Sequence, residues 1–143
     1  MTIKRLLWII GAAISILVVN VAISFLYVAI YSYIIDPGHP EQYYQAYAQI
    51  AAPYSSIIAG MPLFFFVCRW VAAKWEPAFG VKAAVLIWLV YALIDVTVLA
   101  IAGFTLRLAI LSLVSLVTKL GAAYLGGILA SRRAYPNASQ RSK

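Results

Sequence analysis

Acidic residues are scarce in this sequence. Only 4 of the 143 residues are Asp or Glu, against 11 Lys or Arg, and charged residues of both signs amount to 10% of the chain. Soluble domains carry about 25% charged residues and about 45–50% apolar ones, whereas 65% of this chain is hydrophobic. A soluble domain of this size buries only about two-thirds of its surface. We therefore exclude a soluble fold and expect most of the chain to face lipid.

Cysteine and histidine are each present once, as Cys68 and His39. One cysteine excludes an intramolecular disulfide, and one histidine excludes haem ligation by a histidine pair within the chain. The sequence also lacks a paired-carboxylate arrangement, a glycine-rich phosphate loop and a zinc motif. We therefore expect no enzymatic activity and no cofactor.

One group of residues, Asp36, His39 and Glu41, resembles a set of metal ligands. Zinc sites need three or four ligands in a firm geometry, and the neighbouring sequence adds no further ligand. Ordinary loop polarity is the better interpretation, so we expect no metal.

Long apolar runs are what the sequence has in abundance. About 20 helical residues cross the hydrocarbon core of a bilayer. Four runs reach that length, at about 6–34, 50–73, 83–102 and 106–130. The turn residues DPGHP at 36–40 end the first run, and the very short connection 103–105 joins the third and fourth as an antiparallel hairpin. The sequence predicts an all-α polytopic membrane protein, a four-helix transmembrane bundle that forms a single domain over 1–143.

The second run carries two prolines, Pro53 and Pro62. Proline inside a helix removes a backbone hydrogen bond and bends the helix, so we expect a kinked second helix. Breaks at membrane depth are tolerated where neighbouring helices or a watery cavity satisfy the freed carbonyl groups. The kink therefore serves either packing alone or a hinge or binding site.

Basic residues flank the runs on one side of the predicted membrane. Nine of the 11 lie on that side, Arg107 lies on the other, and Lys119 lies within the fourth run. Because positively charged loops stay in the cytoplasm, we expect a multi-pass protein of the cell (inner) membrane, with both termini cytoplasmic and a basic tail at 131–143. The net charge of +7 then reflects topology, and nucleic acid is not an expected partner.

Lys119 stands near the middle of the fourth run, and Asp95 is the only acidic residue in the third. A charge at that depth costs about 2.5–3.5 kcal/mol, so it needs compensation. The helical rise places the two backbones about 9 Å apart in depth, and their side chains lean toward each other. Three interpretations stay open: a structural ion pair, a transport or proton-relay element, or pairing of each charge with another subunit.

Further polar residues recur in the runs around these charges. Asn20, Ser24 and Tyr27 are spaced four and three residues apart and therefore share one helical face. Such a face is either a polar stripe that joins helices or part of a cavity lining. We take as the candidate ligand or ion path Asn20, Ser24, Tyr27, Tyr91, Asp95, Ser115 and Lys119.

Small residues follow on the face of the fourth run that carries Lys119. Ala122, Gly126 and Ala130 are spaced four residues apart. Small residues at this spacing let helices approach closely, so we expect this face to pack against another helix or another subunit.

These features favour a membrane-embedded protein that transports or binds a ligand through a polar centre. Four helices enclose little volume, so we expect a homo-oligomer. The alternative is a non-catalytic accessory or assembly subunit of a larger membrane complex, in which the small-residue faces and the two charges dock another membrane subunit. The lipid bilayer is a partner in both cases.

Overall fold

The structure, a computed structural model, describes residues 2–103 and 105–133, and these are helical apart from the connections. α1 (Ile3–Ile30) continues into one π-helical turn, η1 (Tyr31–Ile35), and is followed by α2 (Glu41–Ala72), α3 (Pro77–Ala102) and α4 (Leu106–Arg133). Within the described residues, four helices are long and apolar enough to cross a membrane. The predicted all-helical fold with four long apolar helices is thus confirmed. Of the predicted tail at 131–143, residues 131–133 belong to α4, and residues 134–143 lie outside the described residues.

Proline and glycine mark the helix boundaries. α2 begins directly after Pro40, and α3 begins at Pro77, a position at which the missing proline N–H costs nothing. Gly38 and Gly103 have φ angles of +98° and +101°, which residues with a Cβ atom rarely adopt. These two glycines let the chain leave α1 and α3 abruptly.

α2 begins earlier than the predicted second span. It includes the tyrosine-rich segment 41–52 and continues as one helix through Pro53 and Pro62. The polar residues 41–52 and the apolar residues that follow them therefore belong to a single helix.

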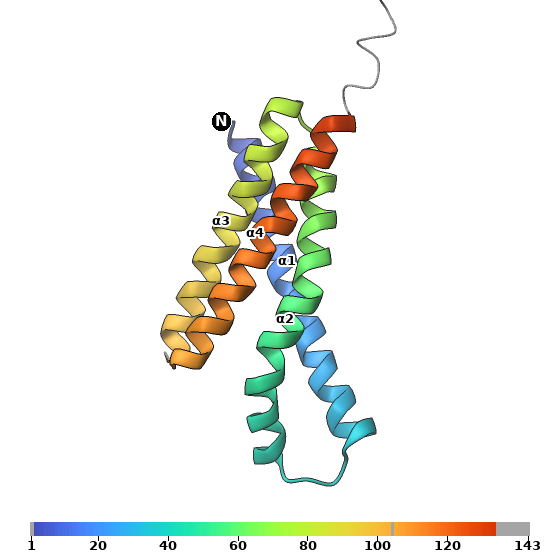
Figure 1. The fold of residues 1–143 in the computed structure, drawn as a ribbon, viewed down its shortest axis with the longest axis vertical. Coiled ribbons are helices and arrows are strands. Elements are labelled where there is room, and N and C mark those ends of the chain that lie inside the picture. The colour runs from blue at the N-terminus through green and yellow to red at the C-terminus, as the bar shows by residue number, and fades with distance from the viewer. Residues whose placement is uncertain (1, 104, 134–143) are drawn as a thin grey trace, which may run out of the picture.

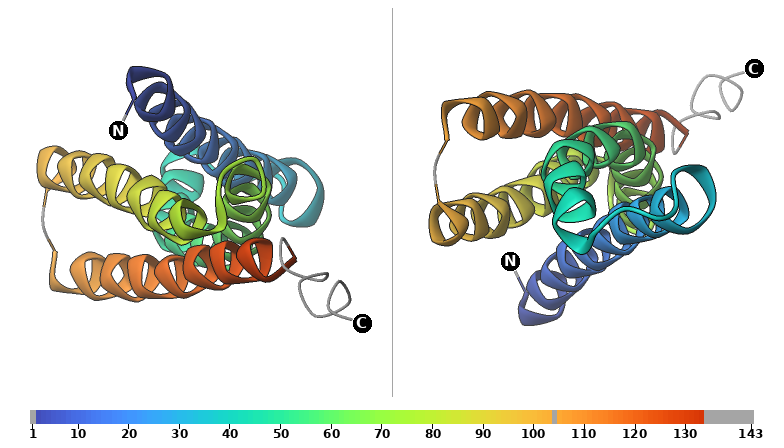
Figure 2. Two further views of the ribbon diagram at one scale, coloured as in Figure 1. Left: turned by 90° about the horizontal axis from the view of Figure 1, so that it is seen from above. Right: turned by 90° about the horizontal axis from the view of Figure 1, so that it is seen from below.

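The N-terminal end of α1 and the C-terminal end of α4 lie at the same end of the bundle (Figure 1). At the opposite end, the α1–α2 hairpin extends beyond the α3–α4 hairpin, and the two hairpins diverge (Figure 1). Viewed along the bundle, α2 lies between α1 and α4 (Figure 2), and it packs against all three other helices. The bundle is therefore arranged around α2.

Apolar packing is concentrated toward the end of the bundle where α1 begins and α4 ends. The buried core residues are Ile9, Ala13, Ile16, Phe64, Cys68, Val71, Ala84, Ile87, Tyr91 and Ala123. Two glycines let α4 approach its neighbours closely. A Cβ atom at Gly126 would lie 2.6 Å from the Phe65 carbonyl oxygen of α2, and one at Gly127 would lie 3.1 Å from Val81 Cα of α3. This packing fixes the positions of the helices on which the polar residues lie.

Candidate functional site

Lys119 of α4 is fully buried in the centre of the bundle. Its Nζ atom donates hydrogen bonds to the Ser56 hydroxyl oxygen at 2.8 Å and to the Tyr91 hydroxyl oxygen at 2.9 Å. The side chain passes over Gly60 of α2, where an added Cβ atom would collide with Lys119 Cε. Two hydroxyl acceptors thus compensate a buried ammonium group, and a glycine makes room for its stem.

Asn20 of α1 completes this arrangement. Its Nδ2 atom donates to the same two hydroxyl oxygens, at 2.7 Å to Ser56 and at 3.2 Å to Tyr91. We name Asn20, Ser56, Tyr91 and Lys119 the polar cluster, and its members come from α1, α2, α3 and α4 in turn. One side chain from each helix meets at this point, so a movement of any one helix changes hydrogen bonds made by the others.

A pocket of about 300 Å³ adjoins the polar cluster and is lined by all four helices. We name it the central pocket. Its polar lining residues are Asn20, Ser24, Ser56, Tyr91, Asp95, Ser112 and Ser115, and the rest of its lining is aliphatic or proline. Sites for small molecules typically measure about 300–1,000 Å³ and combine an apolar lining with a few polar groups. The central pocket therefore suits a small polar ligand.

Asp95 lies on the wall of the central pocket and is half-buried. In the part of the chain that the structure describes, no ion pair or hydrogen bond joins it to Lys119, whose Nζ atom is bonded to Ser56 and Tyr91 instead. The structure therefore brings the two charges to one site without direct contact. The Asp95 carboxylate is left on the pocket wall.

Two buried polar atoms at this site lack a hydrogen-bond partner among the described residues, namely Asn20 Oδ1 and Ser115 Oγ. Both side chains are at most 5% exposed, and both line the central pocket. An unpaired buried atom of this kind costs about 1–3 kcal/mol, and native proteins contain few of them. A solute or water molecule in the pocket would supply the missing partners.

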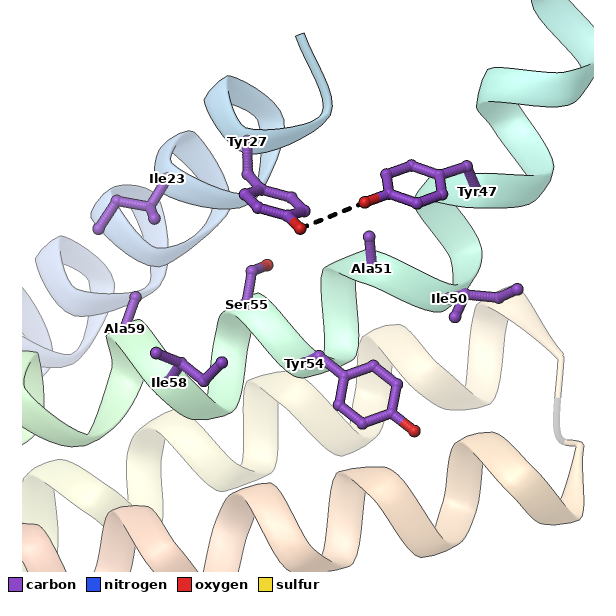
Figure 3. A pocket seen from close by; sticks show the side chains of 9 residues that line it. All are labelled: Ile23, Tyr27, Tyr47, Ile50, Ala51, Tyr54, Ser55, Ile58 and Ala59. Carbon is purple, nitrogen blue, oxygen red and sulfur yellow. Dashed lines mark hydrogen bonds between the residues drawn. The ribbon is translucent and has the colours of Figure 1, made fainter. Parts of the chain in front are cut away.

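Tyr27 lies outside the central pocket. Its hydroxyl oxygen is 3.2 Å from that of Tyr47, and both rings line a separate, mainly apolar pocket of about 410 Å³ between α1 and α2 (Figure 3). Ser55 lies on the wall of this side pocket and shares a hydrogen bond of 2.8 Å with Ser24. The predicted stripe of α1 therefore divides, because Asn20 and Ser24 line the central pocket and Tyr27 lines the side pocket.

Ser56 and Gly60 were missed by the sequence analysis, and Ser112 was left out of the predicted path. A signal for the first two was present in the sequence of α2. Ser56 is a polar residue in an apolar run, and Gly60 follows it by one helical turn, so both lie on the same helical face. A long side chain from another helix can reach the Ser56 hydroxyl because the small residue one turn away leaves space for it.

The three small residues predicted for helix packing face the interior of the bundle. Ala122 packs against the apolar core, and Ala130 is buried. Gly126 meets the backbone of α2, where an added Cβ atom would be 2.6 Å from the Phe65 carbonyl oxygen and 3.2 Å from the Arg69 nitrogen. The face of α4 that carries Lys119 is thus the face that packs on α2.

A second group of polar residues surrounds Asp36 in the connection between α1 and α2. The Asp36 carboxylate accepts hydrogen bonds from Tyr31 and Tyr43 at 3.2 and 3.1 Å and lies 3.1 Å from His39 Nε2. Its carbonyl oxygen accepts from the Tyr44 hydroxyl at 2.7 Å. Partial burial raises the pKa of the Asp36 carboxyl. The hydrogen bonds from Tyr43 and His39 and the charge of His39 outweigh this effect, so the pKa lies below its ordinary value.

The chain matches no protein-family model, no curated protein and no solved structure. Across residues 2–103 and 105–133, no group of three His, Cys, Asp or Glu side chains is placed to hold a metal ion. The polar cluster and the central pocket are therefore the features from which a function can be inferred.

Proposed function

We propose that this chain is an integral membrane protein that binds a small polar solute in the central pocket and carries it across the bilayer. The observation that carries the proposal is the polar cluster, in which side chains from four helices hold a fully buried lysine beside a pocket that also contains Asp95. Ionisable groups inside a membrane are costly, and they commonly mark the path of a substrate or an ion. The unpaired atoms of Asn20 and Ser115 support the same proposal, because a bound solute would pair with them.

The alternative is an accessory subunit that uses its two charges to dock another protein. Docking charges have to be reachable from the outer surface of the bundle. Lys119 instead lies at the centre and is bonded to α2 and α3 of its own chain, while Asp95 lines the central pocket. This geometry favours a solute site over a docking site.

We also propose the topology that the sequence predicts, with four transmembrane helices in the cell (inner) membrane and both termini cytoplasmic. The first turn of α1 and the last turn of α4 lie at one end of the bundle (Figure 1), which agrees with that topology. Pocket residues such as Ala52, Leu99 and Leu108 lie toward the other end. The central pocket is then nearest to the outer face of the membrane.

We further propose that α2 is kinked and that the protein forms a homo-oligomer. Pro53 lines the central pocket and leaves the Gln49 carbonyl without its usual amide donor, so a bend there would place a polar backbone group near the site. Four helices enclose little volume, and further copies of the chain would cover the open side of the pocket.

Cysteine labelling tests whether the central pocket is a wet site. Cys68 is fully buried, so a Cys68→Ala background can carry single cysteines. One replaces Ser112 in the pocket, and the control replaces Val114, which is 46% exposed on the outside of α4. Only a hydrated thiol forms the reactive thiolate. We expect a charged, membrane-impermeant methanethiosulfonate to modify Ser112→Cys in sealed vesicles and to leave Val114→Cys unmodified.

Adding the reagent to each side of the vesicles separates a carrier from a receptor. A carrier exposes its site to the two sides in turn, so we expect labelling of Ser112→Cys from either side. Labelling from one side only would indicate binding without transport. A cysteine that resists the reagent from both sides would mean that the pocket is dry and that the proposed function is wrong.

Native mass spectrometry of the protein, extracted gently from its own membrane, tests the oligomer. We expect several copies of this chain. A different polypeptide at fixed stoichiometry would instead support the accessory subunit.

A further inference from the structure

The polar cluster presents hydrogen-bond donors to the central pocket. Lys119 Nζ and Asn20 Nδ2 can only donate, and both donate to the Ser56 and Tyr91 hydroxyls. With Nδ2 facing these hydroxyls, each hydroxyl oxygen accepts two hydrogen bonds. Ser56 and Tyr91 also bond to each other, so one of the two hydroxyl hydrogens is left for a further partner. Ser56 and Tyr91 both line the pocket. This part of the wall therefore offers a hydroxyl donor beside a buried positive charge.

Another part of the pocket wall, at Asp95, carries a negative charge and accepts hydrogen bonds. An ionised carboxylate only accepts hydrogen bonds, and within the described residues Asp95 has no hydrogen-bond or ion-pair partner. It follows Tyr91 by one turn of α3, so the two backbone positions are about 6 Å apart along the helix axis. A single pocket thus offers a donor at one place and, about one turn away, an acceptor that has no hydrogen-bond partner among the described residues.

A solute with one charge fits this arrangement poorly. An anion at the hydroxyls would be attracted by Lys119 but repelled by Asp95, and a cation at the carboxylate would be attracted by Asp95 but repelled by Lys119. In a low-dielectric bundle such repulsion is strong. A solute that carries both charges meets an opposite charge at each end.

We propose that the solute is a small zwitterion, with its anionic group at the Ser56 and Tyr91 hydroxyls and its cationic group at Asp95. This inference rests on the proposed function and adds the class of solute. The volume of about 300 Å³ corresponds to roughly ten water molecules at about 30 Å³ each, so the solute is compact. Leu17 and Leu111 on the pocket wall suit a short hydrocarbon spacer between the two charged groups.

Equilibrium titration of the full chain in lipid nanodiscs tests this assignment. The probes are straight-chain ω-amino acids from glycine to 6-aminohexanoate, and the straight-chain carboxylate and ammonium ion with the same number of carbons serve as one-charge matches for each, such as butyrate and butylammonium for γ-aminobutyrate. We expect one chain length to bind best. It should bind at least about tenfold more tightly than the carboxylate and the amine of the same length, because each of these meets a like charge in the pocket.

Two variants test which charge causes each binding preference. Asp95→Asn should remove the preference for the ω-amino acid over the carboxylate, and Lys119→Met should remove its preference over the amine. Thr97→Val is the control, because Thr97 is exposed on α3 and is bonded to its own helix at the Leu93 carbonyl. Both preferences should survive in that variant. If Lys119→Met does not fold, Asp95→Asn carries the test alone.

The contrary outcomes are distinct. A carboxylate or an amine that binds as tightly as the ω-amino acid overturns the zwitterion and identifies an anion or a cation site. No binding by any ω-amino acid overturns it as well. The labelling of Ser112→Cys is independent of these probes, so a labelled pocket keeps the proposed function even where the zwitterion fails.

Discussion

Gly60 and Lys119 share one space between α2 and α4, because the methylene stem of the lysine lies where a side chain at residue 60 would be. By crossing this glycine, the lysine reaches Ser56 one turn earlier on α2. The bundle thereby accommodates a long polar side chain without separating the two helices. The position of the ammonium group depends on the lack of a side chain at residue 60.

Gly60→Ala should displace Lys119 from the polar cluster. The added Cβ atom would collide with Lys119 Cε and lie 3.3 Å from Nζ, so the lysine has to shift and its two hydrogen bonds weaken. Overpacking of this kind costs about 1–3 kcal/mol, which unfolding in mixed micelles can measure. Shortening the lysine relieves the collision, so Gly60→Ala should cost less in a Lys119→Ala background. An equal cost in both backgrounds would contradict the shared space.

The long apolar helices and their connections could be predicted because they depend on local composition. A run of about 20 apolar residues suits a membrane helix wherever it occurs, and the prolines and glycines of 36–40 and Gly103 act on their own backbone. The contact face of α4 could be predicted in the same way, since Lys119, Ala122 and Gly126 follow one helical period.

The partners of Lys119 could not be predicted from these local rules. Ser56 is 63 residues away in the sequence and Tyr91 is 28 residues away, and periodicity does not give the rotation and depth of one helix against another. From the sequence, Asp95 is the one partner expected for Lys119 within the chain, beside the open alternatives of a relay element and of pairing with another subunit. Two neutral hydroxyls are its direct partners, and close contacts at Gly60 and Gly126 set the relative depth of α2 and α4.

Tyr91→Phe should destabilise the bundle by removing one acceptor of the buried ammonium group. Tyr91 is 1% exposed and accepts from both Lys119 and Asn20. Hydrogen bonds to charged groups contribute about 1.5–3 kcal/mol in water-soluble proteins, and bonds between membrane helices contribute less. We therefore expect a loss of about 1–2 kcal/mol in the free energy of unfolding. Tyr124→Phe, at a side chain that is 50% exposed, should change little, and equal effects of the two variants would contradict a special role for the Tyr91 hydroxyl.

Gly126→Ala should disturb the packing of α4 on α2, and Gly121→Ala is its matched control. A Cβ atom at Gly126 would lie 2.6 Å from a backbone oxygen of α2, which cannot move aside as a flexible side chain can. A Cβ atom at Gly121 would meet no described atom within 4 Å. We expect a loss of about 1–3 kcal/mol for the first variant and a change within about 0.5 kcal/mol for the second. Thermal unfolding in detergent distinguishes the two variants. A Gly126→Ala variant as stable as Gly121→Ala would show that α4 and α2 are farther apart than these contacts require.

The connection between α1 and α2 should loosen in acid. The pKa of Asp36 lies below its ordinary value of 3.8. A carboxyl whose pKa is lowered by folding stabilises the folded state above its unfolded pKa, and this contribution is lost as the pH falls through the folded pKa. We expect the ring resonances of Tyr43 and Tyr44 to change in that acid range in an NMR titration. Asp36→Asn should abolish the step and Glu41→Gln should keep it, whereas a step that survives in Asp36→Asn would assign it to another group.

Asp95→Asn and Lys119→Met distinguish a structural ion pair from two charges that await a solute. Removing one partner of a buried pair costs about 3–5 kcal/mol. Asp95 makes no direct contact with Lys119 in the described chain, so we expect Asp95→Asn to cost less than about 1 kcal/mol. Lys119→Met loses two hydrogen bonds and should cost more. The two charges attract each other across the site without direct contact, so we expect the double variant to cost somewhat less than the sum of the two single changes. A double variant that is more stable than Lys119→Met alone would show that the charges pair within the chain. A double variant that is less stable than Lys119→Met alone leaves the Asp95 carboxylate available to a solute, as the zwitterion requires.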